Sequence, residues 1–307
     1  MPFTRVPVLL AVLLLTTIAA SCARDEAPEA AASPSTEGAD MMNEASALDA
    51  DREWMAALER GDAAAAGDRL DSDFEWTNTE GWIRTRDEAI LSAAQLADSL
   101  RGETDVQTYH YGHVEVITSA RPGERVMRVW ALRPDGWRAL AVIGTALAAG
   151  TTPFAATGLT VVGDCENPCR SMPYAAITDN ERAIADIFMQ LKMDEWHPNP
   201  ERWAPYVLDD VYYTTATARL SKAARVEHLT ALREANAPSV PGDPVVSMRI
   251  VDFGDSAVMI ARHNPYRGGQ PYHSVRVWAF RDGRWQLANT QQTAIADAPA
   301  AQPVAVI

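Results

Sequence analysis

The chain contains a long internal repeat. Residues 128–147 read RVWALRPDGWRALAVIGTAL, and residues 276–295 read RVWAFRDGRWQLANTQQTAI. Trp130 in the first segment and Trp278 in the second stand at the same place, at an offset of 148 residues. Solenoid repeats have periods of about 20–50 residues, so a repeat of this length indicates a duplicated domain. The chain is therefore predicted to hold two copies of one fold.

An upstream match extends the repeat over most of the chain. LDSDFEW from Leu70 matches LDDVYYT from Leu208 at an offset of 138 residues, and short insertions in the second copy explain the larger offset downstream. The predicted division is a first domain over residues 46–147, a connector over 148–177, a second domain over 178–297 and a tail over 298–307.

The pattern of apolar residues is the same in both copies. Each is predicted to begin with an amphipathic helix, capped by Ser46 or Thr178, and to continue with a short helix, a strand pair, a third helix and long antiparallel strands. These last strands are predicted at Val106–Thr118, Glu124–Arg133 and Trp137–Leu147 in the first copy. In the second they are predicted at Val245–His263, with a break near Gly254, at Tyr272–Arg281 and at Trp285–Ile295. The predicted fold class is α+β, with each copy a curved antiparallel sheet packed against three helices.

Residues 1–22 are typical of an export signal. Arg5 is the only charge, and an apolar run of 15 residues follows from Val6 to Ala20. Such a run is too short to span a bilayer core of about 30 Å and has the length of a signal-peptide core. The sequence AASC, ending at Cys22, resembles a bacterial lipobox, so we expect Cys22 to be acylated and to anchor the exported chain at the periplasmic or cell-surface side of a membrane. An ordinary secretory signal, cleaved near Ala20 or Ser21, is the alternative.

The segment that follows the signal has the composition of a disordered chain. Residues 23–45 are rich in Ala, Pro, Glu, Asp and Ser and have no apolar period. They bury too little surface to offset their chain entropy, so we predict a flexible acidic tether.

The net charge is −14, and no clustered basic face appears in the sequence of the kind that neutralises nucleic-acid phosphates. We therefore expect no nucleic-acid partner, and membrane contact only through the lipid anchor.

Two further cysteines, Cys165 and Cys169, lie between the copies in the segment GDCENPCRS. In an exported protein such a pair most simply forms a disulfide, and Asn167-Pro168 supplies the intervening turn. A metal or redox site is the alternative, but no His lies nearby to complete a zinc set and the spacing is not that of a thioredoxin motif. We predict a disulfide that clamps the interdomain connection.

These patterns together resemble a known family. Paired N-terminal helices, the LxxDF/V segment entering a strand, an aromatic-Gly pair and the closing VWxxRDGxW hairpin are similar to the nuclear-transport-factor-2-like cone fold, in its SnoaL-like branch. The resemblance covers residues 46–147 and 178–297. It implies a sheet curled around a blind apolar pocket, and often dimerisation through the outer sheet face. Because the family includes isomerases, cyclases, dehydratases and binding or structural modules, it does not assign an activity.

A ligand pocket is predicted on the concave face of each sheet, where polar groups lie among aromatic ones. Its predicted lining residues are Tyr213, Thr215, Arg276, Trp278, Asn289 and Gln291 in the second copy, and Trp76, Tyr111, Arg128 and Trp130 in the first. Strand alternation puts Asn289 and Gln291 on the face of Trp285 and Leu287. The alternative is that Arg276, Asn289 and Gln291 lie on the outer face, in water or at a dimer contact.

Catalytic candidates are few. His263 and His273 are candidate general bases because histidine moves a proton near neutral pH, and Arg276 is the candidate for stabilising developing negative charge. His110, His113 and Glu115 are metal-ligand types, but three residues of one strand do not converge on an ion without a bulge. We therefore predict no metal and no cofactor.

The sequence thus predicts a lipid-anchored protein of two tandem cone-shaped domains that binds a small, largely apolar or amphipathic ligand without turnover, chiefly in the second copy. The alternatives are an enzyme of the isomerase, dehydratase or cyclase type, and a structural module whose pockets are filled. The two copies are expected to pack on each other as an intramolecular pseudo-dimer, with a homodimer as the alternative.

Overall fold

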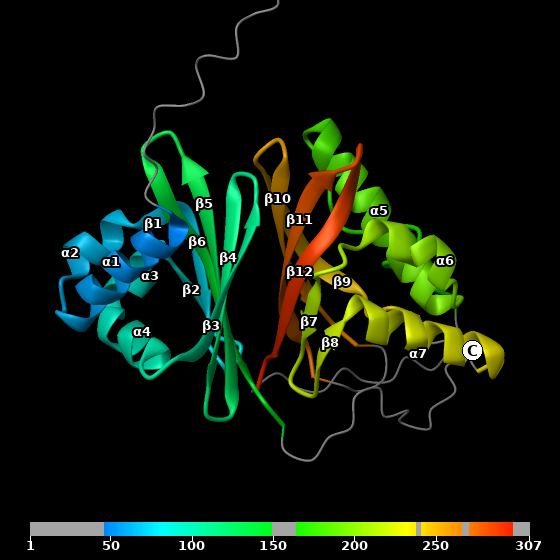
Figure 1. Cartoon of the computed structure of the whole chain (residues 1–307), viewed down its shortest axis with the longest axis horizontal. Coiled ribbons are helices and arrows are strands. Elements are labelled where there is room, and N and C mark those ends of the chain that lie inside the picture. The colour runs from blue at the N-terminus through cyan, green and yellow to red at the C-terminus, as the bar shows by residue number, and fades with distance from the viewer. Residues whose placement is uncertain (1–45, 149–163, 238–240, 266–269, 297–307) are drawn as a thin grey trace, which may run out of the picture. The chain divides into compact units, whose positions relative to one another are not determined.

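The computed structural model describes residues 46–148, 164–237, 241–265 and 270–296. Within them, two six-stranded sheets follow one another along the chain, and Figure 1 shows helices covering one face of each. The predicted α+β fold class, present twice in tandem, is confirmed. The signal segment, Cys22 and the tether precede residue 46 and lie outside the described residues, as does the whole tail.

The first sheet has the strand order β2-β1-β6-β5-β4-β3. Its strands are β1 (Leu70–Thr77), β2 (Ile83–Thr85), β3 (Thr104–Tyr111), β4 (Val114–Arg121), β5 (Glu124–Arg133) and β6 (Gly136–Ala146). Its helices are α1 (Ala47–Glu59), α2 (Ala63–Asp68), α3 (Arg86–Leu91) and α4 (Ala93–Leu100). The third helix that we expected in this copy is divided at Ser92, whose backbone leaves the helical conformation between α3 and α4.

The second sheet repeats this order as β8-β7-β12-β11-β10-β9. Its strands are β7 (Tyr212–Thr214), β8 (Arg219–Ser221), β9 (Val245–Asp252), β10 (Ser256–His263), β11 (Tyr272–Arg281) and β12 (Arg284–Ala294). Its helices are α5 (Asp179–Trp196), α6 (Pro200–Trp203), the short 3-10 helix η1 (Ala204–Tyr206) and α7 (Lys222–Glu234).

Each sheet is mixed, whereas we expected wholly antiparallel sheets. β1 pairs with β6 in parallel, and β7 pairs with β12 in parallel, while the other neighbours are antiparallel. The reason lies in the connection. Between the first strand and the last, the chain forms a short strand, a helical segment and three meander strands. A crossover of this length permits parallel pairing.

The single strand predicted over Val106–Thr118 is wrong. The structure has a hairpin there, with β3 and β4 joined at Gly112, whose φ is +66°. Glycine adopts this conformation without a Cβ penalty, so the chain reverses at that point. The matching Gly254 has φ +90° and joins β9 to β10.

The helices that begin each copy are fixed by local caps. The Ser46 side chain accepts a hydrogen bond from Asp49 N, and the Asp49 carboxylate bonds back to Ser46 N, which makes a capping box for α1. The Thr178 side chain likewise accepts from Glu181 N at the start of α5. Such caps satisfy amide groups that have no partner inside the helix. Both helices then bury one apolar face against their sheet.

Three apolar clusters hold the described residues together. One joins the first sheet to its helices around Trp54 and Trp130, and a second joins the second sheet to its helices around Trp203 and Trp278. The third contains residues of both sheets, such as Val129 and Val277, so the two sheets bury their other faces in one shared core. We call this contact the seam.

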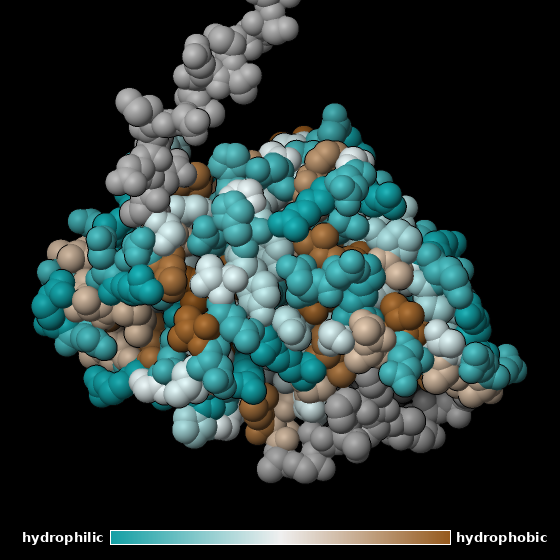
Figure 2. All heavy atoms as spheres, in the orientation of Figure 1, coloured by the Kyte–Doolittle hydropathy of each residue, from teal (hydrophilic) through white to brown (hydrophobic). Residues whose placement is uncertain are grey.

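The surface is mainly polar on the face in Figure 2, where hydrophobic residues are scattered in small groups. Among the described residues, no helix combines the length and the apolar character needed to cross a membrane.

Candidate ligand-binding site

A cavity of about 170 Å³ lies on the helix-covered face of the second sheet. Its apolar wall is formed by Phe188, Leu191, Leu220 and Leu287, and its polar lining by Lys192, Glu195, Tyr213, Thr215, Arg225, Arg276, Thr290 and Gln292. Three residues predicted from the sequence, Tyr213, Thr215 and Arg276, are therefore brought together here.

Three polar side chains form a row across the floor of this cavity. Arg276 of β11 is the cross-strand partner of Thr290 of β12, and Thr290 is the partner of Tyr213 of β7. Neighbouring strands lie about 4.8 Å apart, so the guanidinium and the two hydroxyl groups arise from adjacent positions on one face. Within the described residues, Thr290 Oγ1 and Tyr213 Oη are buried and have no hydrogen-bond partner.

Arg276 is a buried cation, only 3% exposed. Its hydrogen bonds both leave from Nη1, one to Ser274 Oγ at 2.5 Å and one to His263 Nε2 at 3.2 Å. Burial lowers the pKa of Arg276, yet the ordinary value for arginine is so high that the group stays charged. No carboxylate among the described residues forms an ion pair with it. Instead, its Cζ lies 4.8 Å from the centroid of the Phe188 ring.

His263 is held neutral beside Arg276. Because an arginine only donates, His263 Nε2 accepts from Arg276, and the protonated Nδ1 donates to Asp243 O at 3.2 Å. Burial lowers the pKa of His263 well below its usual value, and the charge of Arg276 lowers it further. Both ring nitrogens are therefore engaged, which leaves neither free to take a proton from a ligand.

His273, the other candidate base, lies on the opposite face of the sheet. His273 lies three positions before Arg276 on β11 and is paired with Arg262 of β10. Side chains alternate between faces along a strand, so an offset of three puts the two side chains on opposite faces. Burial lowers the pKa of His273 to about 4, with the charge of Arg262 acting in the same direction. The structure thus does not bring His273 and Arg276 together.

Glu195 is a second charged group that lines the cavity, and it was not among the predicted site residues. Glu195 is bound by Lys192 Nζ at 2.8 Å and by Arg225 Nη2 at 3.2 Å. Burial alone would raise the pKa of Glu195, but the two cations outweigh it and lower the value to about 2. The Lys192–Glu195 spacing of three residues on α5 is common on exposed helices, so it does not distinguish a carboxylate that lines a cavity from one at the surface.

Asn289 and Gln291 do not line the cavity, which corrects the parity expected for β12. Val277 is paired with Asn289, but the next residue, Trp278, is paired with Leu287, so Ala288 is an extra residue in the strand. Such a bulge reverses the alternation of side chains beyond it. Thr290 and Gln292 therefore face the cavity in place of Asn289 and Gln291.

Gln291 instead crosses the seam. Its Nε2 donates to Arg125 O at 3.0 Å and to Ile143 O at 2.8 Å, both in the first sheet. Tyr111, another residue predicted to line a pocket, also lies in the seam, where its hydroxyl donates to Ala288 O at 3.3 Å. Their polar atoms satisfy backbone groups between the sheets.

Arg128, the counterpart of Arg276 in the first domain, is fully neutralised. Its Nε donates to Asp51 Oδ1 at 2.7 Å and its Nη2 to Asp51 Oδ2 at 3.1 Å, while Nη1 donates to both oxygens of Glu103 at 2.5 Å. Counted back from the C-caps of the two helices, Asp51 and Phe188 occupy the same position. Asp51 lies nine residues before Arg60 of α1, and Phe188 lies nine residues before His197 of α5. The second domain thus has a ring where the first has a carboxylate.

The predicted tryptophans are parts of the two helix-side cores. Trp130 is buried and donates from Nε1 to Asp51 Oδ1 at 3.0 Å, and Trp278 is buried in the second core. Trp76 is also buried, but it borders a separate cavity of about 440 Å³ in the first domain, and Arg84 Cζ lies 4.6 Å from its ring centroid.

The possible metal set on β3 and β4 does not converge. His110 Nδ1 lies 3.0 Å from Glu115 Oε1, whereas His113 Nδ1 lies 2.9 Å from Asp255 Oδ1 in the second domain. No cluster of three or more His, Cys, Asp or Glu side chains suited to a metal ion occurs in the described parts of the chain.

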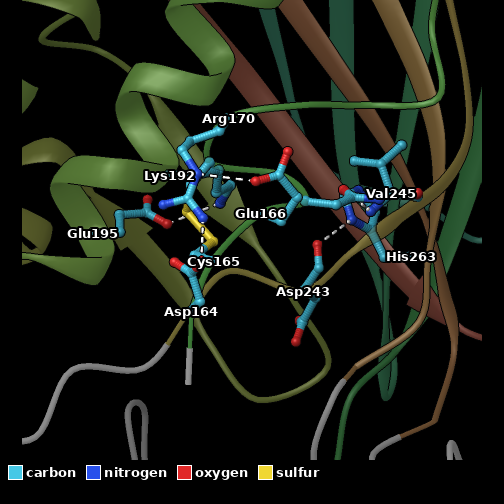
Figure 3. The surroundings of a disulfide bond; sticks show 11 residues. Asp164, Cys165, Glu166, Arg170, Lys192, Glu195, Asp243, Val245 and His263 are labelled. Carbon is cyan, nitrogen blue, oxygen red and sulfur yellow. Dashed lines mark hydrogen bonds and ion pairs between the residues drawn. A yellow bond between two sulfur atoms is a disulfide. The ribbon is translucent and has the colours of Figure 1, made fainter. Parts of the chain in front are cut away.

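The predicted disulfide between Cys165 and Cys169 is confirmed. Figure 3 draws the disulfide together with Lys192 of α5, a residue that lines the cavity and lies, like Pro168 of the disulfide loop, against Gly242. Between the two cysteines, Asn167 exchanges two hydrogen bonds of 2.9 Å with the backbone of Val245 at the start of β9. The disulfide segment therefore packs against elements that support the cavity.

No family model and no curated protein matches the chain. Among solved structures it is similar to an NTF2-like protein from Cytophaga hutchinsonii, at 17% identity and a TM-score of 0.33, over 38% of this chain and 100% of that one. It is also similar to a putative dehydratase of the NTF2-like family from Streptomyces avermitilis, at 19% identity and a TM-score of 0.27, over 33% of this chain and 92% of that one.

A third similar structure is an NTF2-like protein of unknown function in nutrient uptake from Rhodospirillum rubrum, at 17% identity and a TM-score of 0.27, over 34% of this chain and 100% of that one. At such identities and TM-scores the likeness says nothing about activity.

Proposed function

We propose that the second domain binds a small amphipathic ligand in its 170 Å³ cavity and releases it unchanged. The observation that carries this proposal is the row of buried donors, in which Thr290 Oγ1 and Tyr213 Oη have no partner in the described residues. An unpaired buried polar group costs about 1–3 kcal/mol. A ligand that accepts hydrogen bonds from the row removes this cost.

The dimensions of the cavity limit the ligand. An engineered apolar cavity of about 150 Å³ holds one benzene molecule, and the cavity here is of similar size, about 170 Å³. Phe188 and Leu287 offer apolar contact on one side. The ligand therefore combines a compact apolar body with a polar end.

Binding without chemistry is supported by the environment of the candidate bases. His263 uses both ring nitrogens in hydrogen bonds, and His273 lies on the other face of the sheet. A general base must reach the proton that it removes. This arrangement favours a binding protein over an isomerase, dehydratase or cyclase.

We also propose that the chain is exported and acylated at Cys22. The charge, apolar run and AASC sequence of residues 1–22 support this, and a disulfide such as Cys165–Cys169 suits an oxidising compartment. Growth of a bacterial host with labelled palmitate tests it. We expect label in the wild-type chain and none in Cys22→Ala, and a wild-type chain without label would refute acylation.

Native mass spectrometry of the full chain, purified from an exporting host, tests the binding proposal. We expect an additional mass of a small molecule that disappears on denaturation, and the released molecule should be unchanged after incubation with fresh protein. Conversion of the molecule would establish the enzyme instead. A chain that stays bare when incubated with small organic acids, amides and alcohols would favour the structural module with filled pockets.

A further inference from the structure

We propose that the ligand is a monocarboxylate, and that Arg276 binds its carboxylate together with the hydroxyl groups of Thr290 and Tyr213. This inference rests on the proposed function of the second domain. It adds the chemical class of the ligand and the side chains that recognise it.

The charges around the cavity leave Arg276 without a carboxylate in direct contact among the described residues. Lys192 and Arg225 both bind Glu195, so that carboxylate is already shared by two cations. The carboxylate of Asp243 accepts a hydrogen bond from Tyr272 Oη at 3.1 Å. His263 is neutral, and no carboxylate of the described residues lies within ion-pair distance of Arg276, although Glu195 and Asp243 favour its charge from farther away.

A buried charge is stable only when it is paired or well hydrogen-bonded. The hydrogen bonds of Arg276 within the described residues use Nη1 alone. Its Nε and Nη2 have none there, and a guanidinium offers such neighbouring N–H groups in the spacing that two carboxylate oxygens match. Thr290 and Tyr213 continue the row with hydroxyl donors, because burial and the charge of Glu195 raise the pKa of Tyr213 well above its usual value and keep it protonated.

The first domain shows how the counterpart of Arg276 obtains its hydrogen-bond acceptors. In the first domain, Asp51 takes Nε and Nη2 of Arg128 in a two-point contact. In the second domain the matching helix position holds Phe188, whose ring interacts with the cation but accepts no in-plane hydrogen bond. A ligand carboxylate would supply to Arg276 what Asp51 supplies to Arg128.

The apolar wall and the volume define the rest of the molecule. A cavity of about 170 Å³ accommodates roughly six to eight non-hydrogen atoms, by comparison with benzene in a cavity of about 150 Å³. Short branched or cyclic monocarboxylates have this size, with the apolar body against Phe188 and Leu287.

Isovalerate and isovaleramide test this inference, because they have the same shape and differ in charge. Calorimetric titration of the full chain with each should show isovalerate binding at least tenfold more tightly. The same titrations of Arg276→Gln should show the two affinities equal, with its circular dichroism spectrum reporting that the variant is folded.

Each outcome separates the two proposals. If the wild-type chain binds the amide as tightly as the acid, the carboxylate inference is overturned while ligand binding stands. If neither compound binds, nor any acid, amide or alcohol of that size, the proposed function fails as well. An unchanged preference for isovalerate in folded Arg276→Gln would show that another cation recognises the anion.

Discussion

Arg276 lies over the ring of Phe188, with Cζ 4.8 Å from the ring centroid, whereas its counterpart Arg128 is bound at two points by Asp51. The two arginines occupy equivalent strand positions, and the ring and the carboxylate occupy equivalent helix positions. Together with Glu103, which also binds Arg128, this exchange separates a core that neutralises its own arginine from a cavity in which no carboxylate of the described residues forms an ion pair with Arg276.

Phe188→Asp should convert the second domain to the arrangement of the first. The new carboxylate would pair with Arg276 and compete with a ligand anion, so we expect the affinity for isovalerate to fall at least tenfold. Calorimetric titration measures it, and Phe188→Leu, which keeps an apolar wall, is the control that should bind far better. Equal isovalerate binding by Phe188→Asp and the wild type would contradict this account of the site.

Asp51→Asn should destabilise the first domain strongly. The substitution leaves Arg128 buried with half of its negative partners removed, and breaking a buried ion pair costs about 3–5 kcal/mol. Urea unfolding gives the change in free energy. Glu53→Gln on the same helix removes the exposed pair with Arg69 and should cost under about 1 kcal/mol. A similar small loss for both variants would show that the buried pair does not stabilise the fold.

Glu195→Gln should remove a stability contribution that depends on acid pH. The pKa of Glu195 is about 2 in the folded chain, against an ordinary value of 4.5, so the folded state favours the ionised form. This contribution is complete above about pH 4.5, where it amounts to about 3 kcal/mol, and is lost as the pH falls toward 2.

Unfolding free energies of the wild type and Glu195→Gln should accordingly converge as the pH is lowered from 4.5. Urea titrations at a series of pH values measure this difference. Glu201→Gln, which removes the exposed partner of Arg233, serves as the control and should show little difference at any pH. A gap between wild type and Glu195→Gln that stays constant down to the lowest pH would contradict the prediction.

Gln291→Leu should weaken the seam. It removes the two hydrogen bonds that the Gln291 amide donates to Arg125 O and Ile143 O, and a typical hydrogen bond contributes a net stability of about 0.5–1.5 kcal/mol. Chemical unfolding measures the loss. Gln286→Leu on the same strand removes a bond to the exposed carbonyl of Pro205 and should cost less, because water can replace the donor. A larger loss for Gln286→Leu would show that the seam contacts contribute little.

The sequence was sufficient for features that depend on local pattern. The offset between Trp130 and Trp278 identified the duplication, the Ser46 and Thr178 caps located the first helix of each copy, and the spacing of Cys165 and Cys169 predicted their bond. These features are readable because caps, periodic apolar residues and short covalent loops involve neighbours in the chain.

The sequence pattern was insufficient where one extra residue in a strand changes the face of the sheet to which the following side chains point. Asn289 and Gln291 appeared to share a face with Leu287, but the bulge at Ala288 turned them to the seam and put Thr290 and Gln292 in the cavity. Glu195 was likewise missed, since its partner Arg225 comes from a helix that approaches only in the fold.

The sequence by itself determined that this protein has two copies of one α+β domain, because each copy repeats the same short-range propensities. Only the tertiary structure decided which arginine keeps an unpaired charge. Arg128 and Arg276 stand in the same sequence motif, and their difference depends on what the facing helix presents, Asp51 in one copy and Phe188 in the other. Electrostatic pairing is set by distance in space, so residues far apart along the chain control the chemistry of an otherwise identical motif.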